Sequence, residues 1–127
     1  MKKRKLFNLN YSKNNNIYNY NLVIESESET FKSIDSFELM TKAAKSCFEY
    51  IAKNMHFTNT LILCGPGNNG GDGLLIAKFF NENKMDVTIY SPLGVGKTKD
   101  SKKAFNLVEK NNFFKKKIII NEYDLII

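Results

Sequence analysis

The sequence of 127 residues has no tryptophan, two cysteines, two prolines, one histidine and no long apolar run. Without about 20 consecutive apolar residues, no membrane-spanning helix is expected. Cys47 and Cys64 lack C-x-x-C spacing, which predicts two small core residues in a reducing compartment. No base is identifiable near Cys64 that would make it a nucleophile. His56 is expected at the end of a helix, in a surface or capping role.

Acidic residues are absent before Glu25, and the preceding segment is basic and rich in asparagine and tyrosine. No apolar segment follows the basic residues 2–5, so a secretory signal is excluded. The composition of residues 1–24 fits a transit segment or a disordered extension, and both alternatives stay open. We therefore expect a cytoplasmic protein, with a mitochondrial or other organellar location left open by the basic N-terminus.

Hydrophobic residues make up 43% of the chain and charged residues 25%, which is typical of a soluble globular protein with one core. The net charge of +6 raises nucleic acid or an anionic membrane surface as partners. However, lysine is spread along the whole chain, and no helix face or aromatic-basic pattern concentrates the charge. We therefore expect neither a membrane nor a nucleic acid partner from the charge alone.

The most informative stretch runs from a short apolar segment, Leu61–Cys64, through nine glycine-rich residues, 65–73. This pattern predicts a buried strand, a tight loop and then a helix over about 71–83. That geometry directs backbone N–H groups and a helix N-terminus at an anion. Gly65, Gly67 and Gly70 match the dinucleotide pattern G-x-G-x-x-G, although a lone match is weak. No Lys-Ser/Thr follows the loop, so it is not a Walker A loop.

The rest of the chain alternates helix and strand patterns, which predicts a parallel sheet with helices on both faces. A helix over 37–54 is expected to be capped by Ser36. A second is expected to begin near Thr98 or Asp100 and to end near 110, and strands are expected at 87–90, 118–120 and 124–127. Because the sequence stops within an apolar strand, we expect a truncated domain. The expected buried face of the first helix comprises Met40, Ala43, Ala44, Cys47, Phe48, Ile51 and Met55.

The glycine-rich stretch, Cys-Gly-Pro-Gly-Asn-Asn-Gly-Gly-Asp-Gly-Leu at 64–74, resembles the signature of the YjeF N-terminal domain family, the NAD(P)H-hydrate epimerases. Leu-Met-Thr-Lys-Ala-Ala at 39–44 and Asp-Leu-Ile-Ile at 124–127 are similar to two further segments of that family. Thr41 and Ala44 depart from the Glu and Gly of the family pattern. The resemblance implies an α/β fold, a three-layer αβα Rossmann-like sandwich with a parallel central sheet. This domain is expected over 25–127, incomplete at its C-terminal part.

The resemblance also implies an isomerase that interconverts the R and S forms of NADHX and NADPHX, so that a partner dehydratase repairs the S form. It implies substrate-binding roles for Asn68, Asn69, Gly70, Gly71 and Asp72. Asn69 also matches the family's potassium ligand, which implies one potassium ion per subunit, and the complete protein is expected to be a homodimer. The acid/base aspartate of the family would come just after Ile127, so we expect this chain alone to be a weak or inactive epimerase.

A second reading is a binding module without activity. Scaffold proteins of mRNA decapping carry a domain similar to this one, which they use to dimerise and to contact RNA. The basic charge suits this alternative. The intact Asn-Asn-Gly-Gly-Asp at 68–72 suits it less, because a scaffold has no need of a phosphate-binding loop.

Overall fold

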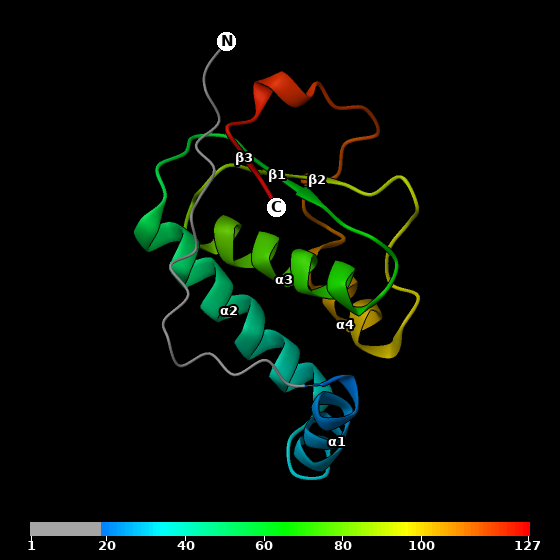
Figure 1. Ribbon diagram of the computed structural model, residues 1–127. Coiled ribbons are helices and arrows are strands. Elements are labelled where there is room, and N and C mark those ends of the chain that lie inside the picture. The colour runs from blue at the N-terminus through cyan, green and yellow to red at the C-terminus, as the bar shows by residue number, and fades with distance from the viewer. Residues whose placement is uncertain (1–18) are drawn as a thin grey trace. The chain divides into compact units, whose positions relative to one another are not determined.

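The computed structural model describes residues 19–127, and the chain divides into two compact units, 1–33 and 34–127 (Figure 1). The described part of the first unit is helix α1, Tyr20–Phe31. The Asn19 side chain caps it by accepting a hydrogen bond from the Leu22 N–H at 3.0 Å. The helix therefore includes residues 20–24, which belong to the segment interpreted from the sequence as a transit segment or a disordered extension. The expectations for residues 1–18 lie outside the described residues.

The second unit is built on a parallel three-stranded sheet of β1 (Thr60–Leu63), β2 (Val87–Tyr90) and β3 (Leu125–Ile126). The strand order is β2-β1-β3, so β1 lies in the middle. Thr60 of β1 is opposite Val87 of β2 and Leu125 of β3. The predicted adjacency of the strands at 61–64 and 87–90 is thus confirmed.

One predicted strand is wrong. Residues 118–120 pair with no strand, and a short 3₁₀ helix, η1 (Ile120–Glu122), begins at the end of this stretch. Ile119 and Ile120 are 62% and 51% exposed, so their apolar character does not reflect a buried strand. The position beside β1 is taken by β3. Among residues 19–127, the outer edge of β2 is met only by a single parallel bridge between Ile89 and Phe114.

Helices α2 (Ser36–Asn54), α3 (Asn68–Glu82) and α4 (Lys99–Val108) lie together on one side of the strands in Figure 1, and η1 lies on the other. α3 packs against α2, α4 and both longer strands. The predicted α/β class with a parallel central sheet is confirmed, in an incomplete Rossmann-like form. Helices were predicted on both faces of the sheet. Within residues 34–127, the only helix on the side opposite α2, α3 and α4 is the short η1.

The first helix of this unit differs from its prediction in two details. Its N-cap is Asp35, which accepts hydrogen bonds from the N–H groups of Phe37 and Glu38, and Ser36 is instead the first helical residue. A carboxylate caps as well as a hydroxyl does, and it also complements the helix dipole. The predicted buried face proves narrower, because Ala43 and Cys47 are exposed at its edge. The buried residues of α2 are Met40, Ala44, Phe48 and Ile51.

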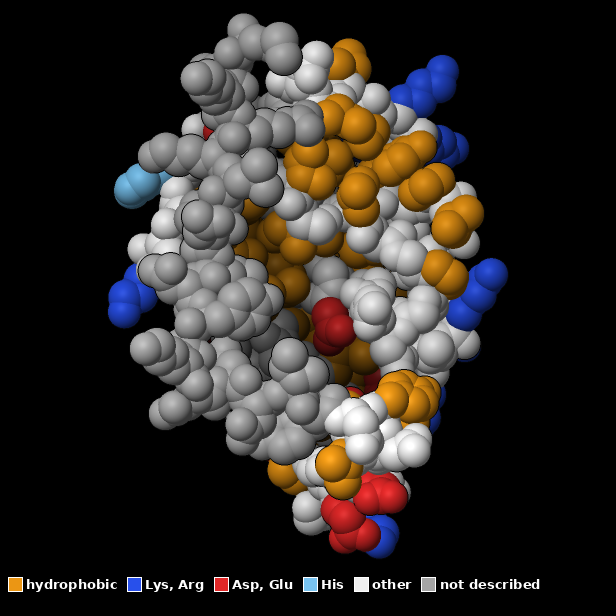
Figure 2. All heavy atoms as spheres, in the orientation of Figure 1, with side chains coloured by type: hydrophobic (Ala, Val, Ile, Leu, Met, Phe, Trp, Pro, Cys, Tyr) orange, Lys and Arg blue, Asp and Glu red, His pale blue; other side chains and the backbone are white. Residues whose placement is uncertain are grey.

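The core lies between the helices and the sheet. Leu74 and Phe80 of α3, Ile89 of β2 and Val108 of α4 are all fully buried there. The other face of the sheet is more open, with Leu63 53% exposed, and Figure 2 shows hydrophobic side chains gathered over the strands. No helix in residues 19–127 is long and apolar enough to cross a membrane.

Candidate functional site

The glycine-rich loop leaves the C-terminal end of the middle strand. After β1 the chain continues through α3 to β2 on one side of β1, and it later returns to place β3 on the other side. The strand order therefore reverses at β1. In open parallel α/β sheets, ligands bind in the crevice at the carboxyl end of the strands where this reversal occurs. The fold thus puts residues 65–67 at the position where such a sheet presents its ligand site.

Helix α3 begins earlier than the sequence pattern predicts. Its first residue is Asn68 rather than a residue near Gly71, and Gly67 is the N-cap with extended backbone angles of φ −89° and ψ −165°. The first helical hydrogen bond runs from the Gly71 N–H to the Gly67 carbonyl at 3.1 Å. The nine-residue loop is therefore reduced to Gly65, Pro66 and Gly67, and three glycines stand inside the helix.

Close packing explains why a helix contains these glycines. A Cβ on Gly70 would lie 1.8 Å from the Gly65 carbonyl oxygen, and one on Gly73 would lie 2.9 Å from the Cys64 sulfur. A Cβ on Gly71 would meet the Met40 sulfur at 3.0 Å and the Ser101 Cα at 3.1 Å. Each glycine destabilises the helix by about 1 kcal/mol relative to alanine. It also lets the loop, α2 and α4 approach the start of α3 closely.

Helix α4 holds the loop from the side. Its N-cap Thr98 and Ser101 form a capping box, in which each side chain accepts a hydrogen bond from the other residue's N–H. The Ser101 hydroxyl also donates to the Pro66 carbonyl at 3.2 Å, and the Lys97 N–H donates to the same oxygen at 2.9 Å. The Thr98 hydroxyl donates to Asn68 Oδ1 at 2.5 Å. The loop and the first residue of α3 are therefore tied to a segment about 30 residues further along the chain.

The five residues that the resemblance implies as substrate ligands lie together in the first turns of α3. Asn68 and Asn69 are exposed, Gly70 and Gly71 are buried, and Asp72 is partly buried. No hydrogen bond to the Asn69 side chain is found within residues 19–127. The first-turn N–H groups of a helix have no intrahelical acceptor and carry the positive end of its dipole. The exposed start of a helix is a position suited to a phosphate group.

Burial changes the proton affinity of two groups near the loop. It raises the pKa of the Asp72 carboxyl above its ordinary value, because the charged form loses solvent. It also raises the pKa of the Cys64 thiol to about 12. Cys64 is buried, as predicted, and its raised pKa leaves almost no thiolate at neutral pH. Asp72 is therefore the titratable side chain of this stretch that can take part in proton chemistry.

The structure gives a further role to Asp100, which the sequence suggested only as a possible start of a helix. It lies in the first turn of α4, is 8% exposed, and accepts a hydrogen bond from the Ser36 hydroxyl at 2.5 Å. Lys103 Nζ stands 3.8 Å from its other carboxylate oxygen. Asp100 thereby joins the first turns of α2 and α4 and places negative charge at their positive ends. Ser36 and Asp100 are 64 residues apart in the sequence, so no local sequence pattern predicts this contact.

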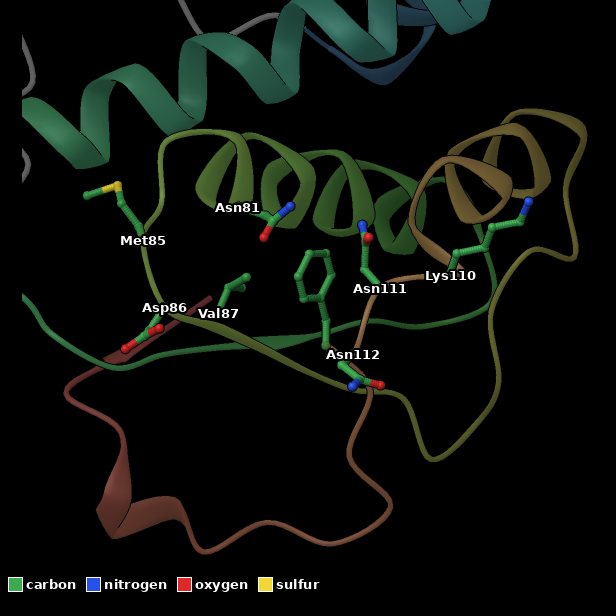
Figure 3. Close-up of a pocket in the computed structure, with 8 residues that line it drawn as sticks. Asn81, Met85, Asp86, Val87, Lys110, Asn111 and Asn112 are labelled. Carbon is green, nitrogen blue, oxygen red and sulfur yellow. The ribbon is translucent and has the colours of Figure 1, made fainter.

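A separate cavity has a volume of about 490 Å³ and opens at the start of β2, away from the end of β1 that carries the loop. Figure 3 shows Asn81 of α3 and Asn111, just after α4, on the helix side of this hollow, with Val87 of β2 below them. Its lining has amides but no cluster of acids or metal ligands, and residues 19–127 hold no group of three His, Cys, Asp or Glu residues suited to a metal ion.

Comparisons with known proteins agree on one family. The family model described as "YjeF-related protein N-terminus" matches residues 36–127. A bifunctional NAD(P)H-hydrate repair enzyme of Dictyoglomus turgidum is 34% identical over 113 residues, which cover 82% of this chain and 22% of that protein. An NAD(P)H-hydrate epimerase of Rhodobacter capsulatus is 38% identical over 61 residues, 42% of this chain and 29% of that protein. One of Plasmodium vivax is 41% identical over 58 residues, 43% of this chain and 20% of that protein.

Proposed function

Because this chain belongs to the YjeF-related protein N-terminus family, we propose that it forms the nucleotide-binding part of an NAD(P)H-hydrate epimerase. The reaction would interconvert the R and S forms of NADHX and NADPHX. The observation that carries the proposal is the exposed start of α3, placed after β1 where the strand order reverses. The names of the relatives support the substrate class, although the chain spans less than a third of the length of each relative described above.

Each site residue has a role suited to its position. The first-turn N–H groups of α3 would bind the pyrophosphate of the dinucleotide, which is the charge that a helix N-terminus stabilises. The amides of Asn68 and Asn69 can donate to phosphate or ribose oxygens. Asp72, which is partly buried and three residues after Asn69, can accept a hydrogen bond from a ribose hydroxyl. Gly70 and Gly71 contribute backbone and the space for close packing.

Epimerisation requires a group that exchanges a proton with the hydrated ring. The aspartate that the resemblance predicts after Ile127 stays a prediction. Among the five site residues only Asp72 titrates, and its raised pKa brings it closer to the range in which a carboxyl group exchanges protons at neutral pH. An Asp72→Asn variant therefore tests the assignment to Asp72, because turnover should be lost while NADP⁺ binding is kept only if Asp72 is the acid/base group.

A potassium ion at Asn69 is part of the proposal. The Asn69 side-chain oxygen is a hard ligand of the kind that such a cation takes, and the exposed side chain has no hydrogen-bond partner within residues 19–127. The residue thus fits as one ligand, and the ion would supply positive charge beside the phosphates. The homodimer, the dehydratase partner and the cytoplasmic or organellar location also stay predictions. The name "bifunctional" of the Dictyoglomus relative supports a second activity that acts with this one.

The test measures NADP⁺ binding to this chain by calorimetry and R-to-S interconversion of NADPHX by a version extended beyond Ile127, followed by chiral chromatography, each in potassium and in sodium buffer. Asn69→Ala should weaken NADP⁺ binding by about tenfold, the value of one to two lost polar contacts, and should remove the preference for potassium. Asn106→Ala, an exposed asparagine on α4, is the matched control and should leave both unchanged. Unaltered binding and potassium dependence in Asn69→Ala would refute the role of Asn69. An RNA oligonucleotide that binds while NADP⁺ does not would favour the scaffold alternative.

A further inference from the structure

The N-cap of α4 makes contacts that capping does not require. A cap needs only to accept N–H groups of its own helix, as Asp35 does for α2 with Phe37 and Glu38. Thr98 does accept the Ser101 N–H at 3.2 Å, but its hydroxyl also lies within hydrogen-bond distance of Asn68 Oδ1, on another helix, as well as of the Ser101 hydroxyl. The cap of α4 is therefore also a contact to the loop.

Each hydroxyl of this contact has two acceptors within reach: Asn68 Oδ1 and the Ser101 hydroxyl for Thr98, and the Pro66 and Thr98 carbonyls for Ser101. One arrangement of protons joins both hydroxyls to the loop. Asn68 Oδ1 has no proton, so the Thr98 hydroxyl must be the donor between them. The Ser101 hydroxyl accepts the Thr98 N–H at 3.0 Å and can then donate to the Pro66 carbonyl. In the arrangement in which Thr98 donates to Oδ1, the Asn68 amide is oriented and its NH₂ group is left to donate elsewhere.

The second anchor is the Pro66 carbonyl. It accepts a hydrogen bond from the Lys97 N–H at 2.9 Å, and the Ser101 hydroxyl lies 3.2 Å from it and 3.2 Å from the Thr98 carbonyl. The Ser101 side chain is fully buried, where each hydrogen bond is costly to lose. Proline fixes its own φ, so holding its carbonyl constrains the loop between β1 and α3.

We propose that Thr98 and Ser101 are positioning residues for the nucleotide. They hold residues 65–68 in place and orient the Asn68 amide so that its NH₂ group donates to an acceptor oxygen of the ligand. This inference rests on the proposed function for the nature of the ligand, but the arrangement of the loop does not depend on it. Because the Thr98 hydroxyl both caps α4 and contacts Asn68, ligand binding at Asn68 is then coupled to the order of the α4 N-terminus.

The experiment uses the full chain and four variants. Thr98→Val removes the hydroxyl and keeps the shape, Thr98→Ser restores the hydroxyl, and Ser101→Ala removes the anchor to Pro66. Asp35→Ala is the control for loss of a helix cap, because Asp35 caps α2 and contacts Lys103 of α4 at 3.8 Å but does not contact the loop. Amide hydrogen exchange is measured without ligand at Lys97 and Gly71, and the dissociation constant of NADP⁺ is measured well below each melting temperature.

Thr98→Val and Ser101→Ala should speed exchange at Lys97 and Gly71 and raise the dissociation constant of NADP⁺ by about three- to tenfold, the value of one hydrogen bond. Thr98→Ser should behave as the original protein. Asp35→Ala should lower the melting temperature to a similar extent without changing either measurement at these sites.

Unchanged exchange in Thr98→Val, or an equal loss of affinity in Asp35→Ala, overturns the positioning role even if NADP⁺ binds. If the unaltered chain does not bind NADP⁺, the proposed function and the ligand assigned here fail together. Faster exchange in Thr98→Val then still establishes that Thr98 holds the loop.

Discussion

Replacing Gly70 by alanine tests the packing of the loop most directly. The new Cβ would stand 1.8 Å from the Gly65 carbonyl oxygen, 2.6 Å from its carbonyl carbon and 2.9 Å from its nitrogen. All three atoms belong to the backbone, so no change of side-chain rotamer relieves the contact. Either the loop or the first turn of α3 must move by more than an ångström, judged against an ordinary contact of about 3.5 Å.

The size of the effect follows from two opposing terms. Alanine in place of glycine favours a helix by about 1 kcal/mol. Overpacking costs about 1–3 kcal/mol, and a contact with fixed backbone belongs at or above the upper end of that range. The net destabilisation is therefore about 2 kcal/mol or more. For a unit the size of residues 34–127, this lowers the melting temperature by about 8–16 °C.

Gly67→Ala is the matched control, because the same methyl group is added in the same loop. No heavy atom lies within 4 Å of the Cβ position, and the backbone angles of Gly67 are accessible to alanine. The free energy of unfolding should change by less than about 0.5 kcal/mol, since the small loss at an N-cap is balanced by reduced freedom of the unfolded chain. Thermal and urea unfolding followed by circular dichroism measure both variants. Equal melting temperatures for Gly70→Ala and the unaltered protein would refute the packing argument.

Two further predictions concern titratable groups. In the native protein, Cys47 should react with a thiol reagent and Cys64 should react only after unfolding, because Cys47 is exposed and burial raises the pKa of Cys64 to about 12; equal labelling rates by mass spectrometry would contradict this. For Asp72, the raised pKa means that the folded state holds the proton more tightly than the unfolded state, so stability should fall as pH rises from about 4, the ordinary aspartate value, through the raised pKa. Urea unfolding of Asp72→Asn should lack this loss, and the same pH dependence in both proteins would show that Asp72 is not desolvated.

Local patterns were enough for the elements that build the site. The apolar runs at 61–64 and 87–90 are followed by helix-forming segments, and this alternation predicted adjacent parallel strands, which the structure confirms. Thr98 was predicted as a possible helix start, and it is the N-cap of α4. Such features depend on residues that are neighbours in the chain, so the order of residue types contains the required information.

Features that depend on distant residues were predicted less well. The apolar residues 118–120 have the composition of a strand, yet the place beside β1 belongs to Leu125 and Ile126. Competition between segments for one sheet edge is decided by the whole fold rather than by propensity. Cys47 falls on a helical apolar pattern, but the width of the buried stripe depends on what α2 packs against.

The site shows the same division. The sequence alone determined that a strand, a glycine-rich turn and a helix follow one another, because glycine and asparagine content restricts the local backbone. Only the tertiary structure decided that α3 begins at Asn68 and that Thr98 orients its amide. Gly70 and Gly73 are required by the Gly65 carbonyl and the Cys64 sulfur, and Asn68 is held from a point 30 residues away. These are steric and hydrogen-bonding conditions between separate elements, and they exist only once the elements have packed together.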